Sequence, residues 1–158
     1  MPRIARLTMD NTAYHIITRG NQKQCVFREP ADYEKYLYLL QKYKQRFKAK
    51  LYCFCLMPNH IHLLMDVPIK TSLNKIMRGL NLSYTRYFNE KYNTVGHLWQ
   101  DRFKSKIIQK DSYLLQCIEY VENNPVRASL VTQIGRYRWS SYFARKEEWT
   151  LLDNLFSI

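Results

Sequence analysis

The order in which the apolar residues change their period restricts the fold of this chain more than any other feature of its sequence. A two-residue period is typical of a half-buried strand, and a period near 3.6 residues is typical of a helix that packs on one side. Strands are expected over residues 11–19, 51–57, 60–67 and 103–109. Helices are expected over residues 30–50, from 72 to a loop at 93–96, and from 111 or 112 to about 123.

Turn and cap residues mark the ends of the earlier segments. Gly20-Asn21 is a turn signal that ends the first strand, and Pro58-Asn59 predicts a hairpin between the second and third strands. Ser72 is a candidate N-cap for the second helix. The strand at 51–57 is apolar on both faces, which predicts a central, buried position in the sheet.

The last helix is bounded by similar signals. Asp111 or Ser112 is expected to cap its start. Pro125 is expected to end it, because the residue before a proline avoids the helical region. Beyond Pro125 we expect short turns, with Trp139 and Tyr142 packed against the body of the protein.

The order of strand, helix, strand, strand, helix, strand and helix predicts an α+β fold. We expect a ferredoxin-like, four-stranded antiparallel sheet with helices packed on one face. RNA-recognition domains share this architecture, so the fold class alone leaves the function open. The 158 residues contain no linker rich in Pro, Gly or Ser, and we expect a single domain over residues 1–158.

The chain is strongly basic. It has 25 Lys and Arg residues against 13 Asp and Glu residues, which gives a net charge of +12, and 15% of its residues are aromatic. Phosphates attract cations and bases stack on aromatic rings, so this composition favours nucleic acid over an acidic partner. A soluble basic protein with tyrosines in its core has the same composition, and composition does not choose between the two.

The sequence also bears on the cellular compartment. No apolar run approaches the roughly 20 residues that span a bilayer, and the first residues lack the apolar core of a secretory signal. The four cysteines form no C-x-x-C pair and are expected to be free thiols in a reducing cytosol. We therefore expect a cytoplasmic protein with no membrane partner.

A His-x-His pair is the first candidate for chemistry. Alternation along the third strand places His60 and His62 on one face, about 6.6 Å apart, where two imidazoles can converge on one ion. Two half-exposed histidines on a solvated strand are the alternative. A third ligand is available on the last helix, where Tyr120 and Asn124 are four residues apart and share a face. Spacing alone favours the alternative, in which Tyr120 is a core residue and Asn124 only ends its helix.

Four segments carry a resemblance to a known family. They occur in the order YHIITRGNQ, LMPNHIHLLM, GHLWQDRF and YVENNPVRASL. With them the chain resembles the single-tyrosine HUH transposases over almost its whole length, most closely the type associated with repetitive extragenic palindromes (REP). It differs from many relatives at Glu122, where they have His, and this glutamate is expected to add a negative charge near the DNA site.

The resemblance implies a function and a set of site residues. It implies that His60, His62 and Asn124 bind a divalent ion, Mg²⁺ or Mn²⁺, and that Tyr120 is the nucleophile. Tyr113, seven residues earlier on the same helix, lies too far along it to share that ion. The implied enzyme is a DNA strand transferase that binds single-stranded DNA with hairpin or palindromic elements, as a monomer or a homodimer. It cleaves and rejoins this DNA through a 5′-phosphotyrosine. A non-catalytic nucleic-acid-binding module of the same fold and a phosphodiesterase that uses water remain as alternatives.

Several polar and basic residues are candidates for DNA contact. Trp99, Phe103 and the neighbouring cations interleave as a platform for single-stranded nucleic acid would, although core aromatics among solvated charges give the same pattern. Arg127 could hold a phosphate or could complement a helix C-terminus. The full set of candidates is Arg19, Asn21, Arg102, Lys104, Lys106 and Arg127.

Overall fold

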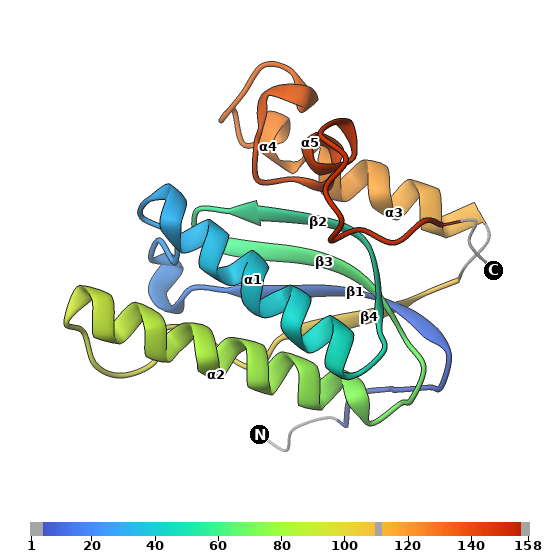
Figure 1. The fold of residues 1–158 in the computed structure, drawn as a ribbon, viewed down its shortest axis with the longest axis horizontal. Coiled ribbons are helices and arrows are strands. Elements are labelled where there is room, and N and C mark those ends of the chain that lie inside the picture. Colours follow the sequence, from blue (N-terminus) through green and yellow to red (C-terminus); the bar gives the residue numbers. More distant parts are fainter. Residues whose placement is uncertain (1–4, 110–111, 156–158) are drawn as a thin grey trace.

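A computed structural model describes residues 5–109 and 112–155 (Figure 1). Its sheet has four antiparallel strands in the order β2-β3-β1-β4. The strands are β1 (Thr12–Arg19), β2 (Lys50–Met57), β3 (His60–Val67) and β4 (Lys104–Ile108). The longer helices are α1 (Pro30–Arg46), α2 (Ser72–Tyr92) and α3 (Ser112–Glu122), and the shorter ones are α4 (Asn124–Arg127) and α5 (Ser141–Lys146). Two 3-10 turns complete the fold, η1 (Asn21–Lys23) and η2 (Ile134–Arg136).

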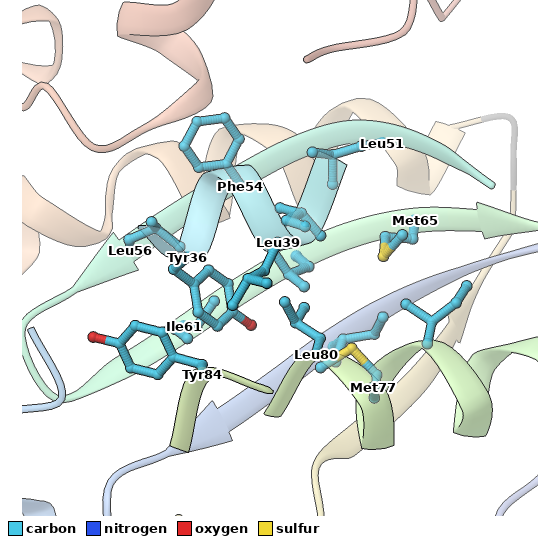
Figure 2. Packing of buried hydrophobic residues seen from close by; sticks show 14 of the residues in the cluster. Tyr36, Leu39, Leu51, Phe54, Leu56, Ile61, Met65, Met77, Leu80 and Tyr84 are labelled. Carbon is cyan, nitrogen blue, oxygen red and sulfur yellow. The ribbon is translucent and has the colours of Figure 1, made fainter. Parts of the chain in front are cut away.

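Helices α1 and α2 cover one face of the sheet. Figure 2 shows their apolar side chains, among them Tyr36 of α1 and Leu80 and Tyr84 of α2, packed against Ile61 of β3 and its neighbours. All four of these side chains are fully buried. The predicted fold class is confirmed: a ferredoxin-like antiparallel sheet with α1 and α2 on one face.

The prediction that all helices share that face is wrong for α3. Its apolar side chains, among them Cys117, Ile118 and Val121, pack in a second cluster with Cys53 and Cys55 on the opposite face of the sheet. The reason is that β2 is apolar on both faces, so each face must be buried by its own layer of helices. Figure 1 shows α3, α4 and α5 gathered on the side of the molecule where β2 lies.

Strand β2 is an edge strand and not the central one that its composition predicted. Its outer edge is covered by the C-terminal part of the chain. The Leu56 amide donates to the Trp139 carbonyl at 2.8 Å, and the Asp153 amide donates to the Leu51 carbonyl at 2.9 Å. These bonds satisfy backbone groups that an open edge would expose.

Other predicted boundaries shift slightly. Helix α1 ends at Arg46 and not at 50, because Lys48 adopts a left-handed conformation with φ of 53° before β2 begins. The N-cap of α2 is Thr71, and Ser72 is its first helical residue. The predicted cap at Asp111 lies outside the described residues.

Pro125 does not end the helical path of the chain. It lies in the first turn of α4. A backbone N–H at this position would have no acceptor within the helix, so its absence in proline costs no hydrogen bond. Trp139 packs against the body as predicted, with its ring stacked 4.6 Å from that of Tyr33. Tyr142 is more exposed, at 41% of its surface, and its ring lies beside Gly135 of η2.

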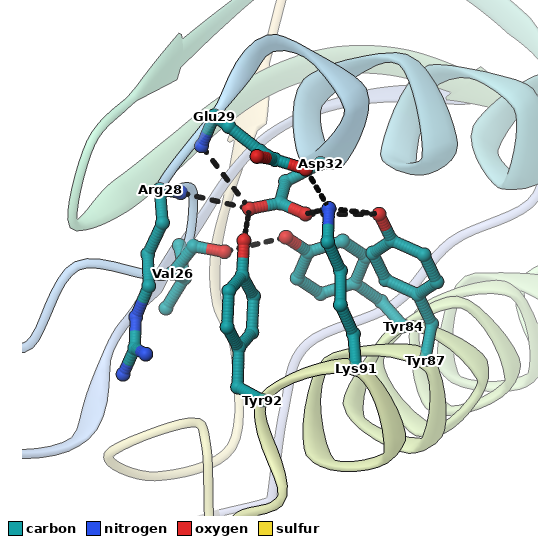
Figure 3. A network of polar contacts seen from close by, with 8 residues as sticks. All are labelled: Val26, Arg28, Glu29, Asp32, Tyr84, Tyr87, Lys91 and Tyr92. Atoms are coloured by element: carbon teal, nitrogen blue, oxygen red, sulfur yellow. Dashed lines mark hydrogen bonds and ion pairs between the residues drawn. The ribbon is translucent and has the colours of Figure 1, made fainter.

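One buried carboxylate joins α1 to α2 (Figure 3). Asp32, in the first turn of α1, is fully buried and accepts hydrogen bonds from Tyr87 at 2.9 Å, from Lys91 at 2.8 Å and from Tyr92. Burial would raise the pKa of this carboxyl, but its hydrogen bonds outweigh burial and hold the pKa below its usual value. Among the helices of the described residues, none combines the length and apolarity needed to cross a bilayer.

Candidate metal and nucleophile site

Three histidines lie on the face of the sheet that α3 covers. His60 and His62 of β3 have the same parity, as predicted, and their ring centroids are 5.1 Å apart. Antiparallel pairing places Arg19 of β1 opposite His60 and Ile17 opposite His62. His15 follows the same parity on β1 and therefore projects from this face too.

His15 was missed as a site residue by the sequence analysis. Its Nε2 lies 2.9 Å from Nδ1 of His62, and the two rings are stacked with centroids 5.2 Å apart. The alternation of β1 gives the face of His15, but only the pairing of β1 with β3 brings the two rings together. That pairing joins positions 47 residues apart, and no local pattern specifies it.

Tyr120 approaches the histidines from α3. Its ring centroid lies 6.2 Å from that of His62 and 6.1 Å from that of His15, each in an edge-on arrangement. The side chain stays accessible, with 51% of the residue's surface exposed. Tyr113 is similarly exposed, at 55%, but makes no ring contact with a histidine among the described residues. The structure thus brings Tyr120, and not Tyr113, to His62, one of the two predicted histidine ligands.

Asn124 begins α4, directly after the end of α3. Its Nδ2 donates to the carbonyls of Tyr120 at 3.4 Å and Val121 at 3.2 Å. This leaves Oδ1, the atom that can ligate a cation, without a hydrogen bond to any described residue. Among those residues no group of three His, Cys, Asp or Glu side chains could hold a metal. Any further ligand of an ion at the two histidines would therefore be of another kind, such as an amide oxygen.

Burial keeps the imidazoles uncharged. It lowers the pKa of His62 to about 3, with smaller contributions from the charges of His15 and His60. It lowers the pKa of His60 to about 4, helped by the nearby charge of Arg19. The pKa of His15 is lowered by burial and by Lys106. At neutral pH these histidines carry free lone pairs, and neutral imidazole is the form that binds metal ions.

Some of the basic candidates lie beside this site. Lys104 pairs with Ile17 and Lys106 with His15, so both lysines share the face of the histidines and are exposed. Arg127 reaches back from α4 over Tyr120, with its guanidinium carbon 4.1 Å from the ring centroid, and donates to the Tyr120 carbonyl at 2.6 Å.

The other two candidates lie beyond the strand ends. Asn21 begins η1, two residues after the last residue of β1, and its backbone N–H donates to the Leu98 carbonyl at 2.8 Å. Arg102 is exposed in the turn before β4. Of the two alternatives for the aromatic residues of this segment, the structure shows core packing, because Phe103 lies in the core formed with α1 and α2 and Trp99 packs against it.

Glu122 does not add an exposed charge to the protein surface. Only 4% of its surface is exposed, and it forms an ion pair with Arg145 of α5. The Ser141 hydroxyl donates to the same carboxylate at 2.5 Å. Glu122 therefore fastens the end of α3 to α5 on the side away from solvent.

Comparison with protein families gives one matching model. The family described as "Transposase IS200 like" matches residues 8–124. A protein of Haemophilus influenzae, named as a REP-associated tyrosine transposase, is 32% identical over 99 residues. The aligned region is 56% of this chain and 56% of that protein, so the chain matches about half the length of this relative.

Two solved structures share the fold. One, described as a REP-associated tyrosine transposase bound to a REP hairpin, superposes with a TM-score of 0.76 at 16% identity, covering 98% of this chain and 90% of the other. The other, a protein of Deinococcus radiodurans R1 described as a transposase, gives a TM-score of 0.52 at 16% identity, covering 77% and 97%.

Proposed function

This chain belongs to the IS200-like transposase family, and from that premise we propose that it cleaves and rejoins single-stranded DNA beside a hairpin. Tyr120 is the proposed nucleophile, and His60, His62 and Asn124 are the proposed ligands of a divalent ion, Mg²⁺ or Mn²⁺. The observation that carries the proposal is the position of Tyr120, half exposed and edge-on to His62. We place the protein in the cytoplasm, on nucleoid DNA.

The donor set fits a divalent ion. Two neutral imidazoles of β3 are available, and Asn124 of α4 adds an amide oxygen that accepts no hydrogen bond from a described residue. Such an ion would polarise the scissile phosphate and favour the phenolate of the attacking tyrosine. With so few protein ligands, such an ion would be able to bind phosphate oxygens as well, as a catalytic ion must.

The proposed reaction balances without another reactant. The Tyr120 phenol loses its proton and its oxygen bonds to phosphorus. The bond from phosphorus to the 3′ oxygen breaks, and that oxygen leaves as a 3′ hydroxyl after it takes up a proton. The 5′-phosphotyrosine keeps the phosphodiester energy, so attack by a 3′ hydroxyl rejoins DNA and frees the tyrosine.

DNA binding is assigned to the basic side chains around this face. The histidines are flanked by Lys104, Lys106 and Arg19. Arg127 lies over the Tyr120 ring, and its guanidinium would be free to bind a phosphate of the DNA instead. Asn21 and Arg102 extend this surface beyond the strand ends. The proposed partner is single-stranded DNA with a hairpin or palindrome, as in the hairpin-bound relative. One chain supplies every proposed site residue, which supports action by a monomer, and a homodimer would carry two such sites.

Labelled hairpin oligonucleotides on a denaturing gel test this proposal. Tyr120→Phe removes only the attacking oxygen and should abolish both the cleaved product and the protein–DNA adduct. Tyr113→Phe, equally exposed on the same helix, is the matched control and should keep the adduct. His60→Ala and His62→Ala should abolish cleavage while hairpin binding persists, because binding rests on many phosphate contacts.

Three results would contradict the assignments. An adduct mapped to Tyr113 by sequencing the modified peptide would overturn the nucleophile. Cleavage without any attached residue would favour water as the nucleophile and a phosphodiesterase. Binding without cleavage under every metal condition would favour a non-catalytic module.

A further inference from the structure

We propose that His15 and Asn59 are positioning residues that fix the ring tautomers of His62 and His60, so that each ligand presents its Nε2 lone pair to the ion. The inference rests on the proposed metal site and adds two residues that do not touch the ion. Neither residue was among the predicted site residues.

The His60 side of the argument depends on which atoms of Asn59 face which partners. Nδ1 of His60 lies 2.7 Å from Oδ1 of Asn59, and Nδ2 of Asn59 donates to the Lys23 carbonyl at 3.5 Å. A carbonyl only accepts, so the Lys23 contact orients the amide with its oxygen toward His60. That oxygen also only accepts, so the proton of His60 sits on Nδ1. Its Nε2 is then unprotonated and available as a ligand.

The His62 side depends on the second imidazole. Nδ1 of His62 lies 2.9 Å from Nε2 of His15, and one of the two nitrogens must carry the shared proton. If His62 carries it, His62 keeps a lone pair on Nε2, and His15 accepts while its own proton sits on Nδ1. If His15 carries it, the proton of His62 moves to Nε2 and blocks the atom that would bind the ion. Metal-ligating histidines almost always donate their other ring N–H to an acceptor, which selects the first arrangement.

His15 is well placed for this role because β1 holds it rigidly. Its neighbours Tyr14 and Ile16 are fully buried on the other face, and β1 is paired on both edges, with β3 and with β4. The stacked ring of His15 also contacts the edge of Tyr120. One side chain therefore touches a proposed ligand and the proposed nucleophile without needing to bind the ion itself.

Long-range proton–nitrogen NMR spectra of the metal-free protein test the tautomers directly. The chain has only four histidines, so single substitutions assign the ring signals. We expect both His60 and His62 to be protonated on Nδ1. In His15→Phe, which keeps a flat ring but removes the acceptor, the His62 proton should shift to Nε2. His15→Gln restores an acceptor and should restore the Nδ1 tautomer. A loss of folding alone would not produce this pattern.

Mn²⁺ titration followed by electron paramagnetic resonance gives the second readout, without DNA or cleavage. Loss of the hydrogen-bond acceptor of a ligating histidine should weaken Mn²⁺ binding about 10- to 100-fold in His15→Phe. His15→Gln should recover most of the Mn²⁺ affinity. The same comparison for His60 uses Asn59→Leu, which removes the acceptor, and Asn59→Asp, which keeps one. Asn59 is a turn residue, so this pair also tests the inference if His15→Phe does not fold. Tyr113→Phe is the unaffected control.

The outcomes separate this inference from the proposed function. An Nε2 proton on His62 in the wild-type protein would overturn the inference, as would His15→Phe and Asn59→Leu variants that bind Mn²⁺ like wild type. If those variants bind normally while His62→Ala loses Mn²⁺, only the positioning role fails. If His62→Ala itself binds Mn²⁺ like wild type, the proposed metal site fails and the inference fails with it.

Discussion

Replacing Arg145 with methionine should destabilise the protein much more than replacing its ion-pair partner Glu122 with glutamine. The two groups differ in their access to water. The side chain of Glu122 is 6% exposed and that of Arg145 is 42% exposed. Arg145→Met leaves a buried carboxylate whose remaining partner is the Ser141 hydroxyl. Glu122→Gln leaves a guanidinium that solvent can hydrate.

The expected magnitudes follow from that asymmetry. Breaking a buried pair so that one charge stays uncompensated costs about 3–5 kcal/mol, which is the expectation for Arg145→Met. In Glu122→Gln the amide oxygen still accepts from Ser141, and the loss resembles that of one hydrogen bond to a charged group, about 1.5–3 kcal/mol. The double variant removes both charges and should be more stable than Arg145→Met alone.

Urea unfolding of the wild type, both single variants and the double variant measures these differences as a cycle. DNA cleavage supplies a second readout, because Glu122 lies on α3 two residues after Tyr120. Arg145→Met should lower cleavage more than hairpin binding, since small displacements of a reacting group slow reactions strongly. Equal destabilisation by the two single variants, or a larger effect of Glu122→Gln, would refute the reasoning that the carboxylate is the buried partner.

Two further predictions concern Asp32 and the histidines. Asp32→Asn should lower the free energy of unfolding in urea by about 3 kcal/mol, because an amide N–H then faces hydrogen-bond donors in a buried site. The control Glu34→Gln, exposed on the same helix, should change that free energy by less than about 0.5 kcal/mol. Because the pKa values of His60 and His62 fall to about 4 and about 3 on folding, the unfolded state binds more protons between about pH 6.5 and pH 4. The free energy of unfolding should therefore fall as the pH drops through that window, and a His62→Phe variant should show a shallower fall; an identical slope would contradict the low pKa of His62.

The sequence predicted the four strands, but alternation fails along β2, where a bulge puts Leu51 and Cys53 on opposite faces of the sheet. The two-residue period of β1 and β3 placed His60 and His62 on a common face, and the structure agrees. This works because parity depends only on neighbouring residues. The spacing of Tyr120 and Asn124 predicted a shared helix face, but Asn124 begins the separate helix α4, because the chain turns before Pro125.

Features that depend on distant parts of the chain could not be predicted. An apolar strand such as β2 can be central in a sheet or lie at an edge between two layers of helices, and its residues are the same in both cases. The contact between His15 and His62 required the register of two strands that are far apart in sequence. The burial of Glu122 required Arg145, which lies beyond several turns without a periodic pattern.

The placement of α3 explains why this fold holds the candidate site. Helices α1 and α2 fill one face of the sheet with the core that includes Tyr36 and Tyr84. Parity then leaves His60 and His62 on the other face, where β2 presents a second apolar surface to be covered. The helix that covers this surface must pass beside the histidines, so the requirement to bury Cys53 and Cys55 also brings Tyr120 within reach of His62. Because packing and the proposed chemistry share one helix, substitutions in the apolar stripe of α3 should alter cleavage before they alter DNA binding, which we assign to basic side chains outside that stripe.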